Sequence, residues 1–215
     1  MAHDLQIKAI LFDMDGTLVD TMAGILVVFR KTFEHFGVNN LPDDEIKAMF
    51  GPTEEGILER VLPGQLETSL PYFLNEYEHQ QKLEPLPFKG MERIFTLLRQ
   101  KGIRVAIVTG KGIGSTEITM RILGMTSWVD EVETGFAEAA NKPLSMRRVL
   151  ERWGIDPQQA AYVGDTSYDM QSAREVGVLP LGAAWAVSPL LGEGNSQAAN
   201  LFFDVESFAK WVEDL

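Results

Sequence analysis

The chain has 215 residues and no cysteine, which excludes a disulfide framework, a thiol nucleophile and cysteine-ligated zinc. Its hydrophobic content of 45% and charged content of 23% are typical of a globular domain, alone or with a modest insertion. The net charge of −12 argues against nonspecific binding to nucleic acid or to an anionic membrane, and an anionic substrate would need a local cation, most simply Mg²⁺.

The chain begins without a basic segment leading into a long apolar run, so we expect a cytoplasmic protein. The first predicted element is a buried strand, Ala9–Phe12, which leads into Asp13-Met14-Asp15-Gly16-Thr17. If the chain stays extended up to the glycine, Asp13 and Asp15 point to the same side. Close carboxylates require a bound cation or a proton kept on one of them. One Asp could then attack phosphorus while its neighbour protonates the leaving oxygen. The alternative is an acidic surface turn.

Every element predicted between Thr17 and Glu84 is a helix. The helices cover about 22–36, a short stretch opened by 41–44, another opened by 51–55, and 66–83. We therefore expect a small helical domain, 20–85, inserted into an α/β core of residues 1–19 and 86–215. Its hinges would be 16–21 and 84–87. The alternative for the insertion is packing bulk with no gating role. Candidate substrate contacts in the insertion are Thr53, Glu54 and Glu55, because their loop could reach the core.

From Gly90 onward, helices and strands alternate regularly. The pattern predicts helices at 91–100, 115–123, 144–153, a helix closed by Gly177, and 207–214. Strands are expected at 103–108, 129–133, 160–163 and 178–181, and an irregular loop at 188–198. This alternation indicates βαβ units and a parallel sheet.

Polar residues follow three of these predicted strands. Thr109-Gly110-Lys111 follows 103–108, and a hydroxyl with backbone N–H groups at such a turn can hold phosphate oxygens. Lys111 could lie near the phosphate, near a second anionic group of the substrate, or in solvent. Asn141-Lys142-Pro143 precedes a helix, with Pro143 suited to its first position. Gly164-Asp165-Thr166-Ser167-Tyr168-Asp169 follows the strand 160–163.

Four patterns in this order resemble the motifs of the haloacid dehalogenase-like (HAD) superfamily of phosphohydrolases. They are the DxDGT run from Asp13, Thr109, the Lys142-Pro143 pair, and the GDxxxD spacing that ends at Asp169. The helical insertion, the Gly51-Pro52 loop and Thr109-Gly110-Lys111 resemble the phosphoglycolate phosphatase-like group, which includes pyrophosphatases. The resemblance implies a Rossmann-like sheet of strand order 5-4-1-2-3, with the insertion as a helical C1 cap that closes over the substrate.

The resemblance also implies a role for each motif residue. Asp13 would be the nucleophile and Asp15 the acid and base. Thr109, with Gly16, Thr17, Gly110 and Lys111 nearby, would hold the substrate, and Lys142 would offset negative charge. Mg²⁺ would be bound by Asp13, the backbone carbonyl of Asp15, Asp165 and Asp169, the last directly or through water.

The sequence therefore predicts a Mg²⁺-dependent phosphatase acting on a small phosphorylated metabolite, either a phosphoglycolate-like monoester or pyrophosphate. Asp15 argues against dehalogenase chemistry, because family dehalogenases lack the second aspartate. Gly164-Asp165-Thr166 differs from the E-D-S of the β-phosphoglucomutase branch. The alternatives are a phosphotransferase or phosphomutase of the superfamily and a non-catalytic binding module. No nucleic-acid or membrane partner is expected, and the substrate and oligomeric state are not readable from the sequence.

Overall fold

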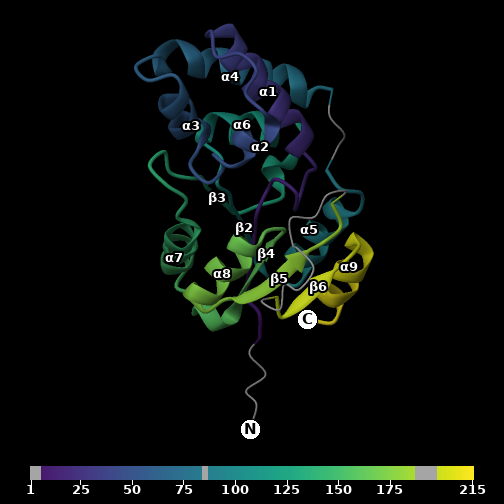
Figure 1. The fold of residues 1–215 in the computed structure, drawn as a ribbon. Coiled ribbons are helices and arrows are strands. Elements are labelled where there is room, and N and C mark those ends of the chain that lie inside the picture. The colour runs from purple at the N-terminus through teal and green to yellow at the C-terminus, as the bar shows by residue number, and fades with distance from the viewer. Residues whose placement is uncertain (1–5, 84–86, 187–197) are drawn as a thin grey trace.

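The computed structural model describes residues 6–83, 87–186 and 198–215. Six parallel strands form one sheet in the order β3-β2-β1-β4-β5-β6 (Figure 1). The strands are β1 (Ala9–Phe12), β2 (Arg104–Val108), β3 (Glu131–Glu133), β4 (Ala160–Gly164), β5 (Leu179–Ala183) and β6 (Asn200–Phe202). Within them, Leu11 of β1 lies opposite Ala106 of β2 and Tyr162 of β4.

The central strand β1 is an apolar run because helices cover both faces of the sheet. Ile10 and Phe12 pack on the face covered by α5 (Met91–Gln100) and α9 (Val205–Glu213). Ala9 and Leu11 pack on the opposite face, against α7 (Lys142–Trp153) and α8 (Ser167–Val176). All four β1 side chains are fully buried. The α/β fold class predicted from the sequence is confirmed.

The sheet contains the expected order 5-4-1-2-3 and one further strand, β6, outside β5. Sequence patterns missed β6 because it has three residues and Phe202 alone is buried. The loop expected at 188–198 lies outside the described residues except for Ala198, as does most of the predicted return hinge at 84–87.

A separate group of helices lies beyond one end of the sheet, at the top of Figure 1. It consists of α1 (Met22–His35), α2 (Asp43–Lys47), α3 (Glu54–Val61) and α4 (Leu66–Gln81). These helices have their own buried cluster, in which the rings of Phe29 and Phe73 lie 4.7 Å apart. Ile118 of α6 (Ile113–Ile122) packs against this cluster. Since the cluster is distinct from the two clusters on the sheet, we propose that α1–α4 form the inserted cap domain, with the boundaries predicted above.

Three helices begin two residues before their predicted starts: α6 at Ile113, α7 at Lys142 and α9 at Val205. Thr53 is the N-cap of α3, and its side chain makes no capping hydrogen bond. Asn141 caps α7 by accepting a hydrogen bond from Leu144 N at 3.2 Å. Lys142 is therefore a helical residue whose direction α7 determines. Two short 3₁₀ turns complete the structure, at Met125–Ser127 and Pro157–Gln159.

Candidate active site

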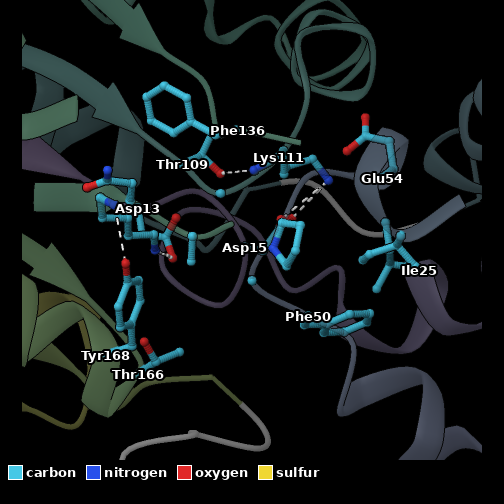
Figure 2. Close-up of a pocket in the computed structure, with 18 of the residues that line it drawn as sticks. Asp13, Asp15, Ile25, Phe50, Glu54, Thr109, Lys111, Phe136, Thr166 and Tyr168 are labelled. Carbon is cyan, nitrogen blue, oxygen red and sulfur yellow. Dashed lines mark hydrogen bonds and ion pairs between the residues drawn. The ribbon is translucent and has the colours of Figure 1, made fainter. Parts of the chain in front are cut away.

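A cavity of about 390 Å³ lies between the carboxyl ends of the strands and the helices α1 and α3. Polar residues from the ends of β1, β2 and β4 line one side of it, and Figure 2 shows their arrangement. Of the residues predicted for the site, the cavity is lined by Asp13, Asp15, Thr109, Gly110, Lys111, Lys142 and Asp165. Of the three candidate substrate contacts in the helical insertion, Glu54 also lines it. The remaining predicted residues do not line it: Gly16, Thr17, Thr53, Glu55 and Asp169.

Three buried carboxylates form a cluster beneath the cavity. Asp13 follows β1, Asp165 follows β4, and Asp169 lies in the first turn of α8. One oxygen from each lies within 4.8 Å of the others. Parallel strands bring the residues after their carboxyl ends to one edge of the sheet, so β1 and β4 place two of these aspartates as neighbours.

The cluster is partly neutralised by Lys142, whose Nζ lies 2.8 Å from Asp13 Oδ2 and 2.5 Å from Asp169 Oδ1. The Tyr162 hydroxyl lies 3.2 Å from the same Asp169 oxygen. Thr166 occupies the N-cap of α8 and donates to Asp169 Oδ2 from its backbone N and its hydroxyl, at 3.0 and 2.5 Å. Both oxygens of Asp169 thus already accept hydrogen bonds within the protein.

Burial and mutual repulsion make ionisation of the cluster unfavourable. Burial raises the pKa of Asp13 to about 7, with contributions from Asp169 and Asp15, even though Lys142 lowers it. Burial also raises the pKa of Asp165 to about 8, reinforced by the charges of Asp13 and Asp169. Asp165 Oδ1 is buried and accepts no hydrogen bond from the described residues. Hard oxygen donors with an unused oxygen fit a divalent cation, so the cluster is a candidate metal centre.

Asp15 belongs to a different set of contacts from Asp13. Strand β1 ends at Phe12 and the chain bends at Met14, so the alternation argument does not apply to this aspartate pair. The hydroxyl of Thr21 donates to Asp15 Oδ1, and Lys111 Nζ lies 3.3 Å from Asp15 Oδ2. Each of the two aspartates therefore has its own lysine partner.

Lys111 is buried, which excludes the solvated alternative. Its Nζ donates to the Tyr77 hydroxyl at 2.7 Å, and that hydroxyl lies 2.8 Å from Thr119 Oγ1. Burial lowers the pKa of Lys111, but Asp15, Tyr77 and Glu54 together raise it above its ordinary value. Lys111 thus connects Asp15 to α4 of the helical group.

The loops after β1 and β2 are shaped by close backbone approaches. Thr109 N donates to Glu133 O at 3.1 Å, and Thr109 Oγ1 accepts from Lys111 N at 3.3 Å. Gly16 has a φ of +74°, and a Cβ there would collide with the Asp165 carboxylate. The Thr17 hydroxyl is buried without a hydrogen-bond partner among the described residues. The absence of a side chain at Gly16 therefore leaves room for the Asp165 carboxylate.

Several residues of the site were not found by sequence reasoning. They are Thr21 and Tyr77, which contact Asp15 and Lys111, Tyr162 beside Asp169, and Phe136 and Tyr168 in the cavity wall. None belongs to a local motif that requires its chemistry. Tyr162 lies in a buried strand, where a tyrosine reads as packing, and Tyr77 shows only helical periodicity.

The sequence pattern that describes the haloacid dehalogenase-like hydrolases matches residues 10–183. The chain belongs to this family. A phosphoglycolate phosphatase of Aquifex aeolicus is 27% identical over 83% of this chain and 85% of its own length. The pyrophosphatase PpaX of Bacillus velezensis is 24% identical, over 86% of each chain. The structure of CbbY from Rhodobacter sphaeroides superposes with a TM-score of 0.81 at 21% identity, covering 98% of this chain and 100% of that one.

These findings confirm the family resemblance and the enzyme class expected from the four motifs. The protein is a haloacid dehalogenase-like phosphohydrolase, and its curated relatives include phosphoglycolate phosphatases and pyrophosphatases. The residue roles are not tested by the comparisons and stay predictions. Among the described residues, no helix has both the length and the apolar character that a membrane crossing requires.

Proposed function

We propose that the protein is a Mg²⁺-dependent phosphatase that hydrolyses a small phosphorylated metabolite through an aspartyl-phosphate on Asp13. The observation that carries this proposal is the buried carboxylate cluster joined to Lys142, beside the polar wall of one cavity. The names of the relatives make a phosphoglycolate-like monoester and pyrophosphate the first candidate substrates. The cytoplasmic location expected from the sequence stays a prediction.

In the first step, a carboxylate oxygen of Asp13 attacks phosphorus in line with the ester oxygen. The bond between phosphorus and the ester oxygen breaks, and a protonated Asp15 transfers its proton to that oxygen as the alcohol leaves. The Thr109 hydroxyl and the amides of Gly110 and Lys111 would hold the oxygens of the transferring group, and all three residues line the cavity. Lys142, 2.8 Å from Asp13, offsets negative charge as the transition state forms.

In the second step, water attacks the phosphorus of the aspartyl-phosphate. Asp15, now a carboxylate, accepts a proton from this water, and the bond between phosphorus and Asp13 breaks. Phosphate is released and both aspartates return to their starting states, so protons balance over the cycle. The contacts of Asp15 with Thr21 and Lys111 hold its carboxylate in one orientation for both steps.

Mg²⁺, when bound, would supply positive charge to the phosphoryl oxygens. We propose that Asp13, Asp165 and the backbone carbonyl of Asp15 hold it. The unused buried oxygen of Asp165 supports this role. Asp169 would contribute through a water, because both of its oxygens already accept hydrogen bonds from Lys142 and Thr166. The cap helices would exclude bulk water during the reaction.

The test measures phosphate release from a panel of phosphorylated metabolites that includes phosphoglycolate and pyrophosphate, with Mg²⁺ and with a chelator. Asp13→Asn should abolish release. Asp20→Asn is the matched control, since Asp20 carries the same group on the same loop but does not line the cavity. Acid quenching during turnover, followed by peptide mass spectrometry, should find phosphate on the peptide that contains Asp13.

Three kinds of result would contradict the proposal. Release that is independent of metal, or that persists in Asp13→Asn, would exclude the mechanism. Phosphate found on Asp13 but passed to a second substrate rather than to water would make the protein a phosphotransferase. A folded protein that binds Mg²⁺ and turns over no phosphate ester would favour the non-catalytic alternative.

A further inference from the structure

The side of the cavity away from the carboxylate cluster is apolar. Its wall comes from α1, from α3 and from the segment that leads into α3, and consists of Met22, Ile25, Phe29, Phe50, Pro52 and Ile57. In the view of Figure 2, Ile25 and Phe50 lie on the same side as Glu54, with Asp15 between them and Asp13. A phosphate bound at Asp13 would therefore point its ester group toward this wall. Burial against it favours a leaving group with an apolar body.

The cations of the cavity are already committed to carboxylates. Among the described residues that line it, Lys111 and Lys142 are the basic ones. Lys142 contacts Asp13 and Asp169, and Lys111 contacts Asp15 and the Tyr77 hydroxyl. A second anionic group on a substrate would have to compete with these carboxylates for a partner.

Glu54 adds a carboxylate at this apolar end. Its side chain is 5% exposed, and Oε2 accepts a hydrogen bond from Gly112 N at 2.8 Å. The other oxygen, Oε1, is buried and accepts no hydrogen bond from the described residues. Lys111 offsets the charge of Glu54 only in part, because the same lysine is paired with Asp15. The remaining negative charge is buried, so little water screens it, and it repels a nearby anion and attracts a donor or a cation.

We propose that Glu54 is a specificity-determining residue that excludes leaving groups with a second anionic group. The leaving group is then an alcohol with an apolar body whose far end is neutral or cationic. This inference rests on the phosphatase function proposed above and narrows its substrate class. It ranks phosphoglycolate, with its carboxylate, and pyrophosphate, with its second phosphoryl group, below neutral esters, and so departs from the two candidates that the relatives' names suggest.

The test compares alkyl phosphates of equal chain length that end in a methyl, hydroxyl, ammonium or carboxylate group. The wild-type protein should show kcat/KM at least about tenfold lower for the carboxylate ending than for the methyl ending at each length, as one unscreened like-charge contact implies. The hydroxyl and ammonium endings should match or exceed the methyl ending. Glu54→Gln should bring the carboxylate-to-methyl ratio close to one, and it should remove any preference for ammonium.

Glu59→Gln is the matched control. Glu59 is in the same helix and its carboxylate also accepts a hydrogen bond from a backbone N, that of Gly64 at 3.0 Å, but it does not line the cavity, so its substitution should leave the ratio unchanged. The carboxylate-to-methyl ratio of kcat/KM is measured within one preparation of each variant, so it does not depend on how much of the protein is folded. A wild-type preference for the carboxylate ending, or a ratio unmoved by Glu54→Gln, would overturn this inference alone. Absence of phosphate release from every ester, including p-nitrophenyl phosphate, would instead overturn the proposed function and this inference with it.

Discussion

Lys142→Met tests whether the buried carboxylates depend on this lysine for their stability in the folded protein. The substitution keeps a long apolar stem in α7 and removes the charge. It breaks the contacts of 2.8 and 2.5 Å to Asp13 and Asp169, and all three side chains are at most 10% exposed. Removing one partner of a buried ion pair typically lowers the free energy of unfolding by about 3–5 kcal/mol. For a chain of this size, we expect the midpoint of thermal unfolding to fall by about 10 °C.

The loss should depend on pH, and its sign follows from the Asp13 carboxyl. Its pKa is already raised to about 7, mainly by burial, and Lys142 opposes that rise. Without the lysine the pKa rises further. A carboxyl with a raised pKa in the folded state favours folding at low pH, and this contribution is lost as pH rises through the folded-state pKa. The variant should therefore be most destabilised, relative to the wild type, near about pH 8.5, and less destabilised near about pH 5.5.

The assay is urea unfolding of the metal-free proteins, followed by far-UV circular dichroism at both pH values. Lys89→Met provides the control for loss of one positive charge, since Lys89 is exposed. A difference below about 1 kcal/mol near pH 8.5, in the range of an exposed ion pair, would refute the reasoning. So would an equal loss at both pH values, because that would trace the effect to packing in α7 rather than to the carboxylates.

Three further substitutions test other parts of the site. Asp165→Asn should abolish the rise in unfolding temperature that Mg²⁺ causes in the wild type, and a rise retained in the variant would show that the metal binds elsewhere. In the wild type the rise should be larger at pH 8 than at pH 6, because protons compete with the metal for a carboxyl whose pKa is raised to about 8. Tyr77→Phe removes the hydroxyl between Lys111 and Thr119 and should lower the free energy of unfolding, measured in urea, by about 1 kcal/mol. An unchanged midpoint would show that this hydroxyl does not contribute to stability. Gly56→Ala should lower both the phosphatase activity and the unfolding midpoint, because the added Cβ would collide with the Ala137 carbonyl oxygen. An increase of up to about 1 kcal/mol in the free energy of unfolding, the usual effect of this substitution in a helix, would show that α3 does not pack against Ala137.

The secondary structure could be predicted closely where local signals agree. Predicted helix 91–100 matches α5 exactly, and predicted strand 103–108 begins one residue before β2. A helix with a buried stripe and a glycine stop, followed by a continuous apolar run, leaves few alternatives. The prediction missed β6 and placed the start of α7 two residues late, because a three-residue edge strand and a capped helix start depend on neighbours in space.

The sequence by itself determined which polar residues stand after which strands, because apolar runs predict the buried parallel strands and the motifs follow them directly. Parallel strands align their carboxyl ends, so the meeting of Asp13 and Asp165 could be anticipated. Only the tertiary structure decided the partners. Lys111 contacts Asp15 and Tyr77, which are 96 and 34 residues away in the chain, and Glu54 reaches Gly112 across 58 residues. The contacts of Tyr77 and Glu54 depend on how α4 and α3 pack against the loop after β2, and no local pattern in the chain encodes that packing.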